Sequence, residues 1–257
     1  MPDEIDPPHA TGLAAETVEA HAKENSELVF HAGWFCPFVQ RVWIALEEKG
    51  LEYEYREVNP YKKEPHFLAI NPKGLVPAIE HHGKALYESL TILEFLDDAY
   101  PSPSLRPSQN PLELGLSRLA AQFISSTVVP SFYKYLQAQG EEKQREAKEL
   151  FTESLKELVE KWFVEGKEWA RSDEFSLVDT ALAPWIVRFY LLEEHRAFDV
   201  EAVGPRFVKY AKKVLARDSV KRTTSDREAL AGTYKRYLDD TAESEVAKST
   251  RSGEPMK

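Results

Sequence analysis

The stretch Leu28–Gly50, LVFHAGWFCPFVQRVWIALEEKG, contains the only cysteine of the 257-residue chain. Its opening apolar run predicts a β-strand over 28–31, and apolar residues at steps of three and four after Pro37 predict an amphipathic helix that ends before Gly50. Proline is favoured at the first position of a helix, where its missing N–H costs nothing. We therefore expect Cys36 at the N-cap, in the turn between strand and helix.

A thiol at a helix N-cap is expected to be reactive. The unpaired backbone N–H groups and the positive end of the helix dipole favour the thiolate, which is the nucleophilic form. The alternative is a buried packing cysteine, since free cysteines are often buried. With one cysteine, the chain forms no internal disulfide and no two-thiol redox cycle, so redox chemistry would need a second thiol from another molecule.

Composition narrows the class of protein. The net charge of −10 argues against nucleic acid or an anionic membrane as the main partner. No apolar run approaches the ~20 residues that a membrane span needs. The acidic start, MPDEIDPPHA, lacks the apolar core of a secretory signal. Together with the single cysteine, these features predict a cytoplasmic protein.

The hydrophobic pattern changes along the chain and predicts two domains. Strand and helix patterns alternate in the order β-α-β-(α)-β-β-α and then give way to helical periodicity alone. Pro130 is expected to kink one of these helices, Ser176 and Asp179 have capping-box spacing, and the tail from Thr241 is expected to be frayed. The predicted divisions are an N-terminal extension or loosely docked arm at 1–26, an α/β domain at 27–101, a Pro-rich linker at 102–111, and an all-helical domain with its tail at 112–257.

Three further motifs are informative only together with Cys36. One is the cation pair Lys62-Lys63, which is more often a solvated surface than a site. Val76-Pro77 is a candidate cis peptide that would turn the N–H and C=O of Val76 outward to pair with an extended peptide, although an isolated Val-Pro is more often an ordinary strand start. Glu88-Ser89 begins the next helix, where Ser89 is a helix cap and the helix start suits a carboxylate. The Glu88 carboxylate suits an ammonium group. A carboxylate pocket, an ammonium partner, a strand edge and a reactive sulfur describe a groove for a short peptide with charged ends and a thiol, such as glutathione.

These motifs occur in an order that resembles the glutathione transferase superfamily. They are Cys36-Pro37-Phe38 with Arg41, Asn71–Pro77, and Tyr87-Glu88-Ser89 with Leu96-Asp97. The cysteine at the turn resembles that of the omega class, with the lambda class as second choice. The resemblance to the superfamily runs from about residue 27 to 240. It implies a thioredoxin-like N-terminal domain and an all-α C-terminal helical domain.

The resemblance also implies roles for individual residues. Glu88 and Ser89 would hold the γ-glutamyl end of glutathione, and Val76 would pair with its cysteinyl backbone. Lys63 is the match to a lysine near the glycyl end, with Lys62 as the alternative. The implied glutathione-binding set is Phe38, Lys63, Val76, Pro77, Glu88 and Ser89. An acceptor pocket is suggested at Phe35, Phe132, Tyr133, Trp185 and Phe189, although aromatic residues at helical spacing are more often core.

The implied activity is glutathione-dependent thiol transfer or reductive deglutathionylation through a Cys36–glutathione mixed disulfide, with glutathione as co-substrate and no metal. Val39 stands where a dithiol motif would have its second cysteine. The other substrate is expected to be a small aromatic or glutathionylated compound, and the protein is expected to be a homodimer. A carrier of aromatic compounds or glutathione adducts with little turnover is the first alternative, and a member that has kept the fold and lost the chemistry is the second.

Overall fold

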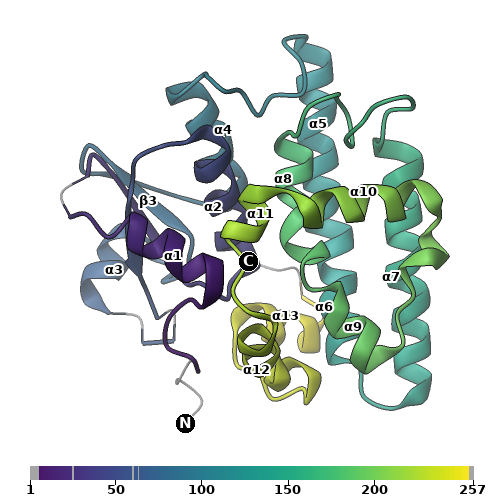
Figure 1. Ribbon diagram of the computed structural model, residues 1–257. Helices are drawn as coiled ribbons and strands as arrows, with labels where there is room; N and C mark the ends of the chain where they lie inside the picture. The colour runs from purple at the N-terminus through teal and green to yellow at the C-terminus, as the bar shows by residue number, and fades with distance from the viewer. Residues whose placement is uncertain (1–5, 25, 60, 63, 255–257) are drawn as a thin grey trace. The chain divides into compact units, whose positions relative to one another are not determined.

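The computed structural model describes residues 6–24, 26–59, 61–62 and 64–254, and these form two compact units (Figure 1). Unit 1 comprises the N-terminal part of the chain as far as Leu105, together with the later segment Arg217–Thr233. Unit 2 comprises Arg106–Ala216 and the segment that begins at Tyr234. The β-sheet lies in unit 1, whereas unit 2 consists of helices, so the predicted fold class is confirmed.

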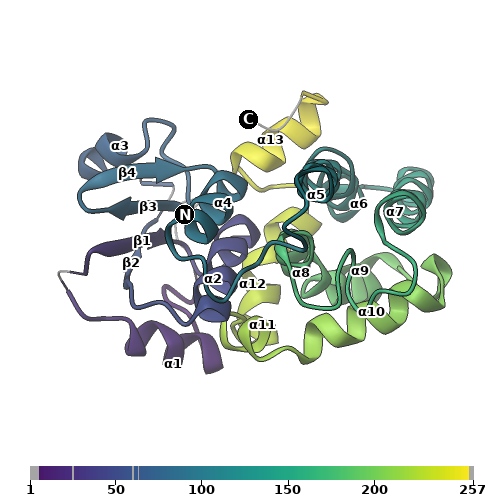
Figure 2. The same cartoon turned by 90° about the horizontal axis from the view of Figure 1, so that it is seen from above.

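A four-stranded mixed sheet forms the centre of unit 1 (Figure 2). Its strands are β1 (Leu28–Ala32), β2 (Glu54–Glu57), β3 (Ala78–His81) and β4 (Lys84–Tyr87). They lie in the order β2-β1-β3-β4, with β1 parallel to β2 and the other pairs antiparallel. Every residue of β1 is buried, as expected for the central apolar strand of a covered sheet.

The helices of unit 1 pack on this sheet and on one another. They are α1 (Gly12–Ala20), α2 (Pro37–Lys49), α3 (Pro65–Ile70), α4 (Ser89–Ala99) and α11 (Asp218–Arg222). Helix α2 ends at Gly50, which adopts the left-handed conformation that favours glycine as a C-cap. It packs against α4, where the Lys49 ammonium donates to the Asp97 carboxylate at 2.9 Å.

A segment from late in the sequence completes unit 1. The Arg217 guanidinium donates to both carboxylate oxygens of Glu48, at 2.5 and 2.6 Å, and the Gln40 amide donates to the carbonyl of Thr223 at 3.1 Å. Helix α1 joins this contact, since the Thr17 hydroxyl donates to the carbonyl of Arg222 at 2.8 Å. Figures 1 and 2 show α11 beside α1. The described part of the expected arm thus includes an ordered helix.

Unit 2 is built from helices of very different lengths. They are α5 (Pro111–Phe123), η1 (Ile124–Val128), α6 (Val129–Gln137), α7 (Glu141–Trp162), α8 (Leu177–Ile186), α9 (Phe189–Arg196), η2 (Val200–Val203), α10 (Pro205–Ala216) and α13 (Glu245–Ser252), and α12 (Arg227–Leu238) begins in unit 1 and ends in unit 2. Among the described residues, no helix is both long and apolar enough to cross a membrane.

Near Pro130, where the sequence predicts a kink, the structure has a π-helical turn, η1, that ends at Val128. Proline has no N–H to donate to the carbonyl four residues earlier, and its ring crowds that carbonyl, so the regular ladder is interrupted there.

The capping box predicted at Ser176 is confirmed. The Asp179 carboxylate accepts the Ser176 backbone N–H at 2.9 Å and its hydroxyl at 2.8 Å. Its other oxygen accepts the backbone N–H of Ala170 at 3.0 Å. Burial raises the pKa of the Asp179 carboxyl, against the opposing effect of these hydrogen bonds. One side chain therefore fixes both the start of α8 and the loop before it.

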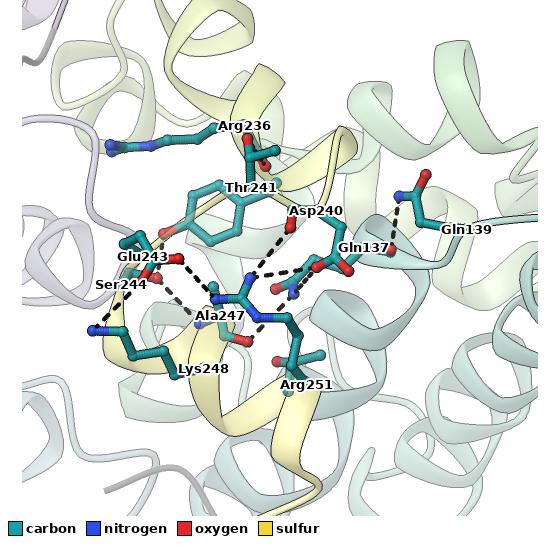
Figure 3. A network of polar contacts seen from close by, with 12 residues as sticks. Gln137, Gln139, Arg236, Asp240, Thr241, Glu243, Ser244, Ala247, Lys248 and Arg251 are labelled. Atoms are coloured by element: carbon teal, nitrogen blue, oxygen red, sulfur yellow. Dashed lines mark hydrogen bonds and ion pairs between the residues drawn. The ribbon is translucent and has the colours of Figure 1, made fainter. Parts of the chain in front are cut away.

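The tail is helical over 245–252, within the part of it that the structure describes, in contrast to the fraying expected from Thr241. Helix α13 packs on α6, and Gln137 links them by donating to Asp240 at 3.1 Å and to the carbonyl of Ala247 at 3.4 Å (Figure 3). The Ser244 hydroxyl caps α13 by accepting the Ala247 N–H at 3.1 Å. Arg251 reaches back from α13 to Asp240 at 3.4 Å. These contacts explain why a polar sequence forms a helix here.

Candidate active site

Cys36 lies at the N-cap of α2, as the sequence predicts, and Pro37 is the first helical residue. The Cys36 N–H donates to the carbonyl of Gly33 at 2.9 Å and closes the turn after β1. Its own carbonyl accepts the first helical hydrogen bond, from Gln40 at 3.0 Å. The residue is half-buried. Cys36 thus directly precedes a 13-residue helix, whose N-terminus favours a thiolate, although its side chain makes no capping hydrogen bond.

The Val76-Pro77 bond is cis, which confirms that prediction, and it lies beside the cysteine. The carbonyl oxygen of Val76 is 3.9 Å from the Cys36 sulfur, within reach of a weak S–H···O contact. Asn71 fixes the preceding turn, because its amide donates to the carbonyl of Leu75 at 2.7 Å while its oxygen accepts the Lys73 N–H at 3.1 Å. The backbone edge at Val76 is therefore held by its own loop.

The start of α4 differs from the prediction by one residue. Glu88, rather than Ser89, occupies the N-cap, with a left-handed φ of 75° that non-glycine residues rarely adopt. Ser89 is the first helical residue and is buried. Its hydroxyl lies 3.3 Å from a guanidinium nitrogen of Arg41, which donates to it, and the same guanidinium lies 5.4 Å from the Phe38 ring centre. A buried cation thus adds to the positive potential of this helix start.

Three lysines bear on the site, and the structure describes two of them. Lys73 donates to the Glu88 carboxylate at 2.7 Å, and this hydrogen bond raises the pKa of the Lys73 ammonium. Sequence reasoning gave Lys73 no role of its own. Lys62 is exposed, and Lys63 lies outside the described residues.

The aromatic residues proposed for an acceptor pocket separate into two groups. Phe35 is in unit 1, next to Cys36, and its ring stacks on that of Tyr61 with centres 6.4 Å apart. The other four belong to unit 2 and are at least 97% buried: they are Phe132, Tyr133, Trp185 and Phe189. There the rings of Phe132 and Phe189 contact that of Phe151. This placement favours the core role over the pocket role for these four.

The signals for the missed contacts were weak in the sequence. Arg41 and Lys73 both stand inside the motifs quoted for the resemblance, but their partners are 48 and 15 residues away. Across the described ranges, no group of three or more His, Cys, Asp and Glu side chains could hold a metal ion.

Comparison with known proteins agrees with this geometry. Residues 35–99, which run from beside Cys36 to the end of α4, match the family "Glutathione S-transferase, N-terminal domain". "Probable glutathione S-transferase GSTU1" of Oryza sativa subsp. japonica is 36% identical over 77% of this chain and 89% of its own.

Solved structures extend the likeness over both units. The crystal structure of glutathione transferase Omega 3C from Trametes versicolor is 51% identical, with a TM-score of 0.79, over 85% of this chain and 98% of its own. The structure of rice GST1 (OsGSTU1) in complex with glutathione is 31% identical, with a TM-score of 0.75, over 84% and 99%. From its fold, its site and these relatives, the chain belongs to the glutathione S-transferase family and is a glutathione transferase.

Proposed function

We propose that this transferase acts as an omega-type thiol transferase, which removes glutathione from glutathionylated substrates through a mixed disulfide at Cys36. The observation that carries the proposal is the position of the only cysteine at the N-cap of α2. Cysteine is the most nucleophilic of the common side chains once ionised, and this position favours ionisation. The 51% identity to a protein named Omega 3C supports the class, while the relative named GSTU1 is a more distant match.

The chemistry balances with glutathione as the only reductant. The Cys36 thiolate attacks the glutathione sulfur of a glutathionylated substrate, so a Cys36–glutathione disulfide forms as the substrate's sulfur leaves as a thiolate and takes up a proton. The thiolate of a second glutathione then attacks the glutathione sulfur of that disulfide. Glutathione disulfide is released, and the Cys36 thiolate is regenerated. Val39 cannot resolve the disulfide from within, so every turnover consumes two glutathione equivalents, one of them supplied by the substrate.

The surroundings of Cys36 suit glutathione as the bound co-substrate. The Ser89 hydroxyl and the start of α4, with the Arg41 guanidinium behind them, suit the γ-glutamyl carboxylate. The Glu88 carboxylate suits the γ-glutamyl ammonium once Lys73 has moved from it. The backbone of Val76 suits the cysteinyl backbone, next to the cysteine sulfur.

The test compares the wild type with Cys36→Ser in the steady-state, glutathione-dependent reduction of a small glutathionylated disulfide. Turnover that disappears in the variant supports the proposal. Equal turnover in both overturns it, because a serine cannot form the mixed disulfide. Absence of turnover in both also overturns it and favours the carrier function, which a titration with aromatic ligands would then measure. Conjugation of glutathione to an electrophile is the control activity, since Cys36→Ser is expected to retain or raise it.

The remaining features of the proposal are its acceptor and its assembly. A planar aromatic acceptor is supported by the stacked pair Phe35 and Tyr61, and titration with an aromatic panel to micromolar concentration tests it. A homodimer is proposed from the resemblance, and a cytoplasmic location from the single cysteine. Light scattering at micromolar concentration gives the mass of the assembly, and a monomer would overturn the dimer.

A further inference from the structure

Glu57 is a carboxylate near Cys36 to which the proposed mechanism gives no task. It is the last residue of β2, which runs parallel to β1 and pairs Glu57 with Ala32, one residue before the turn that leads to the cysteine. The residue as a whole is exposed, but both of its carboxylate oxygens accept hydrogen bonds from neighbouring groups. One accepts the backbone N–H of Trp34 at 3.1 Å, and the other accepts the Tyr55 hydroxyl at 3.2 Å.

The hydrogen bond from Trp34 supplies an acceptor for a backbone N–H group that has no partner within its own turn. The turn runs from Gly33 to Cys36 and is closed by the Cys36 N–H on the Gly33 carbonyl. In such a four-residue turn the N–H of the second residue has no partner inside the turn. Here that residue is Trp34, which is 1% exposed, so its N–H would be buried without a partner if Glu57 did not accept it.

We propose that Glu57 is a positioning residue for Cys36: its carboxylate holds the Gly33–Cys36 turn through the Trp34 N–H and so keeps the sulfur at the start of α2. A hydrogen bond to a carboxylate is roughly twice as strong as one to a neutral oxygen. The strength of the hydrogen bond from the Trp34 N–H therefore depends on whether Glu57 is ionised.

The electrostatics around Glu57 make that dependence measurable. Burial of the carboxyl raises the pKa of Glu57 to about 7, against the opposing effects of the hydrogen bonds from Trp34 and Tyr55. The Tyr55 hydroxyl is within electrostatic reach of Glu57, Tyr53 and Cys36. A negative charge near a thiol opposes its ionisation, whereas a well-placed helix N-terminus favours it. The positioning effect of Glu57 therefore favours ionisation of the Cys36 thiol, whereas the negative charge of Glu57 opposes it.

The experiment measures the rate at which iodoacetamide alkylates Cys36 between pH 5 and 10, read by intact mass. Cys36 is the only thiol of the chain, and the rate measured in Cys36→Ser, which reports alkylation of other side chains, is subtracted. The variants are Glu57→Gln, which is neutral but keeps an acceptor, and Glu57→Leu, which has none. Glu80→Gln is the control, since the Glu80 carboxylate bonds His31 in the same sheet. Circular dichroism and urea unfolding establish that each variant is folded.

We expect the pH midpoint of alkylation to rise in the order wild type, Glu57→Gln, Glu57→Leu. A rise of about 0.5 unit for Glu57→Leu corresponds to about a threefold lower rate below the midpoint. The control should match the wild type. Equal falls of the midpoint in both Glu57 variants would mean that charge alone acts, and no change in either would mean that Glu57 does not act on Cys36; each result overturns the proposal.

The variant Tyr55→Phe provides a second, independent test, because it leaves the hydrogen bond from the Trp34 N–H to Glu57 in place. The Tyr55 hydroxyl lowers the pKa of Glu57, so its removal should raise that pKa and leave more of Glu57 protonated near neutral pH. The variant should alkylate more slowly than the wild type near pH 7 and match it by about pH 9. Slower alkylation at every pH would contradict the role of Glu57 ionisation.

The inference rests on the proposed function for its importance, but alkylation needs no turnover. If Cys36→Ser keeps the wild-type reductase activity, the proposed function is wrong. The order of the alkylation midpoints still tests the positioning role of Glu57 independently. If the midpoints do not move, the positioning role fails while Cys36 remains the proposed nucleophile.

Discussion

Replacing Asp97 by alanine should be among the most damaging single changes in unit 1. Its carboxylate accepts the Lys49 ammonium at 2.9 Å and the Leu105 N–H at 2.6 Å with one oxygen, and the Ser104 hydroxyl at 2.9 Å with the other. The Lys49 side chain has no exposed surface, and that of Asp97 is 6% exposed. Asp97→Ala leaves the Lys49 ammonium buried beside the carbonyl of Pro103, to which it donates at 2.5 Å.

We expect Asp97→Ala to lower the free energy of unfolding by about 3–5 kcal/mol, the usual cost of removing one partner of a buried ion pair. A stable domain has about 5–15 kcal/mol in total, so this loss is large. The double variant Lys49→Met, Asp97→Asn removes both charges and keeps an amide oxygen for the Leu105 N–H. It should therefore be closer to the wild type than Asp97→Ala is.

The assay is urea unfolding, followed by tryptophan fluorescence and by circular dichroism, whose transitions must coincide for a single free energy to be defined. Trp34 and Trp43 report on unit 1. Glu153→Ala, which removes an exposed ion pair with Lys156, is the control and should cost about 0–1 kcal/mol. A loss under about 1 kcal/mol for Asp97→Ala, or a double variant less stable than the single one, would refute the reasoning.

Three further predictions follow from contacts described above. Asp179→Ala should lower the free energy of unfolding by about 2–5 kcal/mol, because two buried N–H groups lose their acceptor, and Asp179→Asn should cost less in the same urea assay. Burial lowers the pKa of His31, so the folded chain binds fewer protons there than the unfolded chain below about pH 6.5. Stability should therefore fall as the pH drops from 6.5 through the folded-state pKa, and thermal melts at several pH values should show a smaller fall in His31→Gln. Under the proposed function, Lys73→Ala should tighten glutathione binding by up to about fivefold in calorimetric titration, since the ligand's ammonium no longer displaces a lysine from Glu88; unchanged or weaker binding would argue against that exchange.

The features that could be predicted from the sequence depend on residues close together in the chain. Cys36 precedes a helix-starting proline, and Ser176 lies three residues before its capping partner Asp179. In both cases the preference of the local backbone decides the structure. The contacts that were missed join distant residues, such as Arg41 with Ser89. No local rule reports such a pair.

Ser89 shows how tertiary contacts override a local preference. Serine is favoured at the N-cap and glutamate is not, so the sequence places the cap one residue too late. In the structure Arg41 engages the Ser89 hydroxyl, and Glu88 takes the cap position in a rare backbone conformation. Glu57 was missed for a similar reason: in the sequence it is one of the charged residues of an alternating strand, and only the parallel pairing of β2 with β1 brings it to Trp34.

The contribution of Arg217–Thr233 to unit 1 has a consequence for synthesis of the protein. A growing chain that has emerged only as far as residue 105 still lacks the partners of Gln40 and Glu48 on α2. Helix α2, which directly follows Cys36, acquires these contacts after more than a hundred further residues have been made. On the ribosome, the two units are therefore expected to mature together rather than one after the other, and a fragment cut at Leu105 should be less stable than the same residues in the full chain.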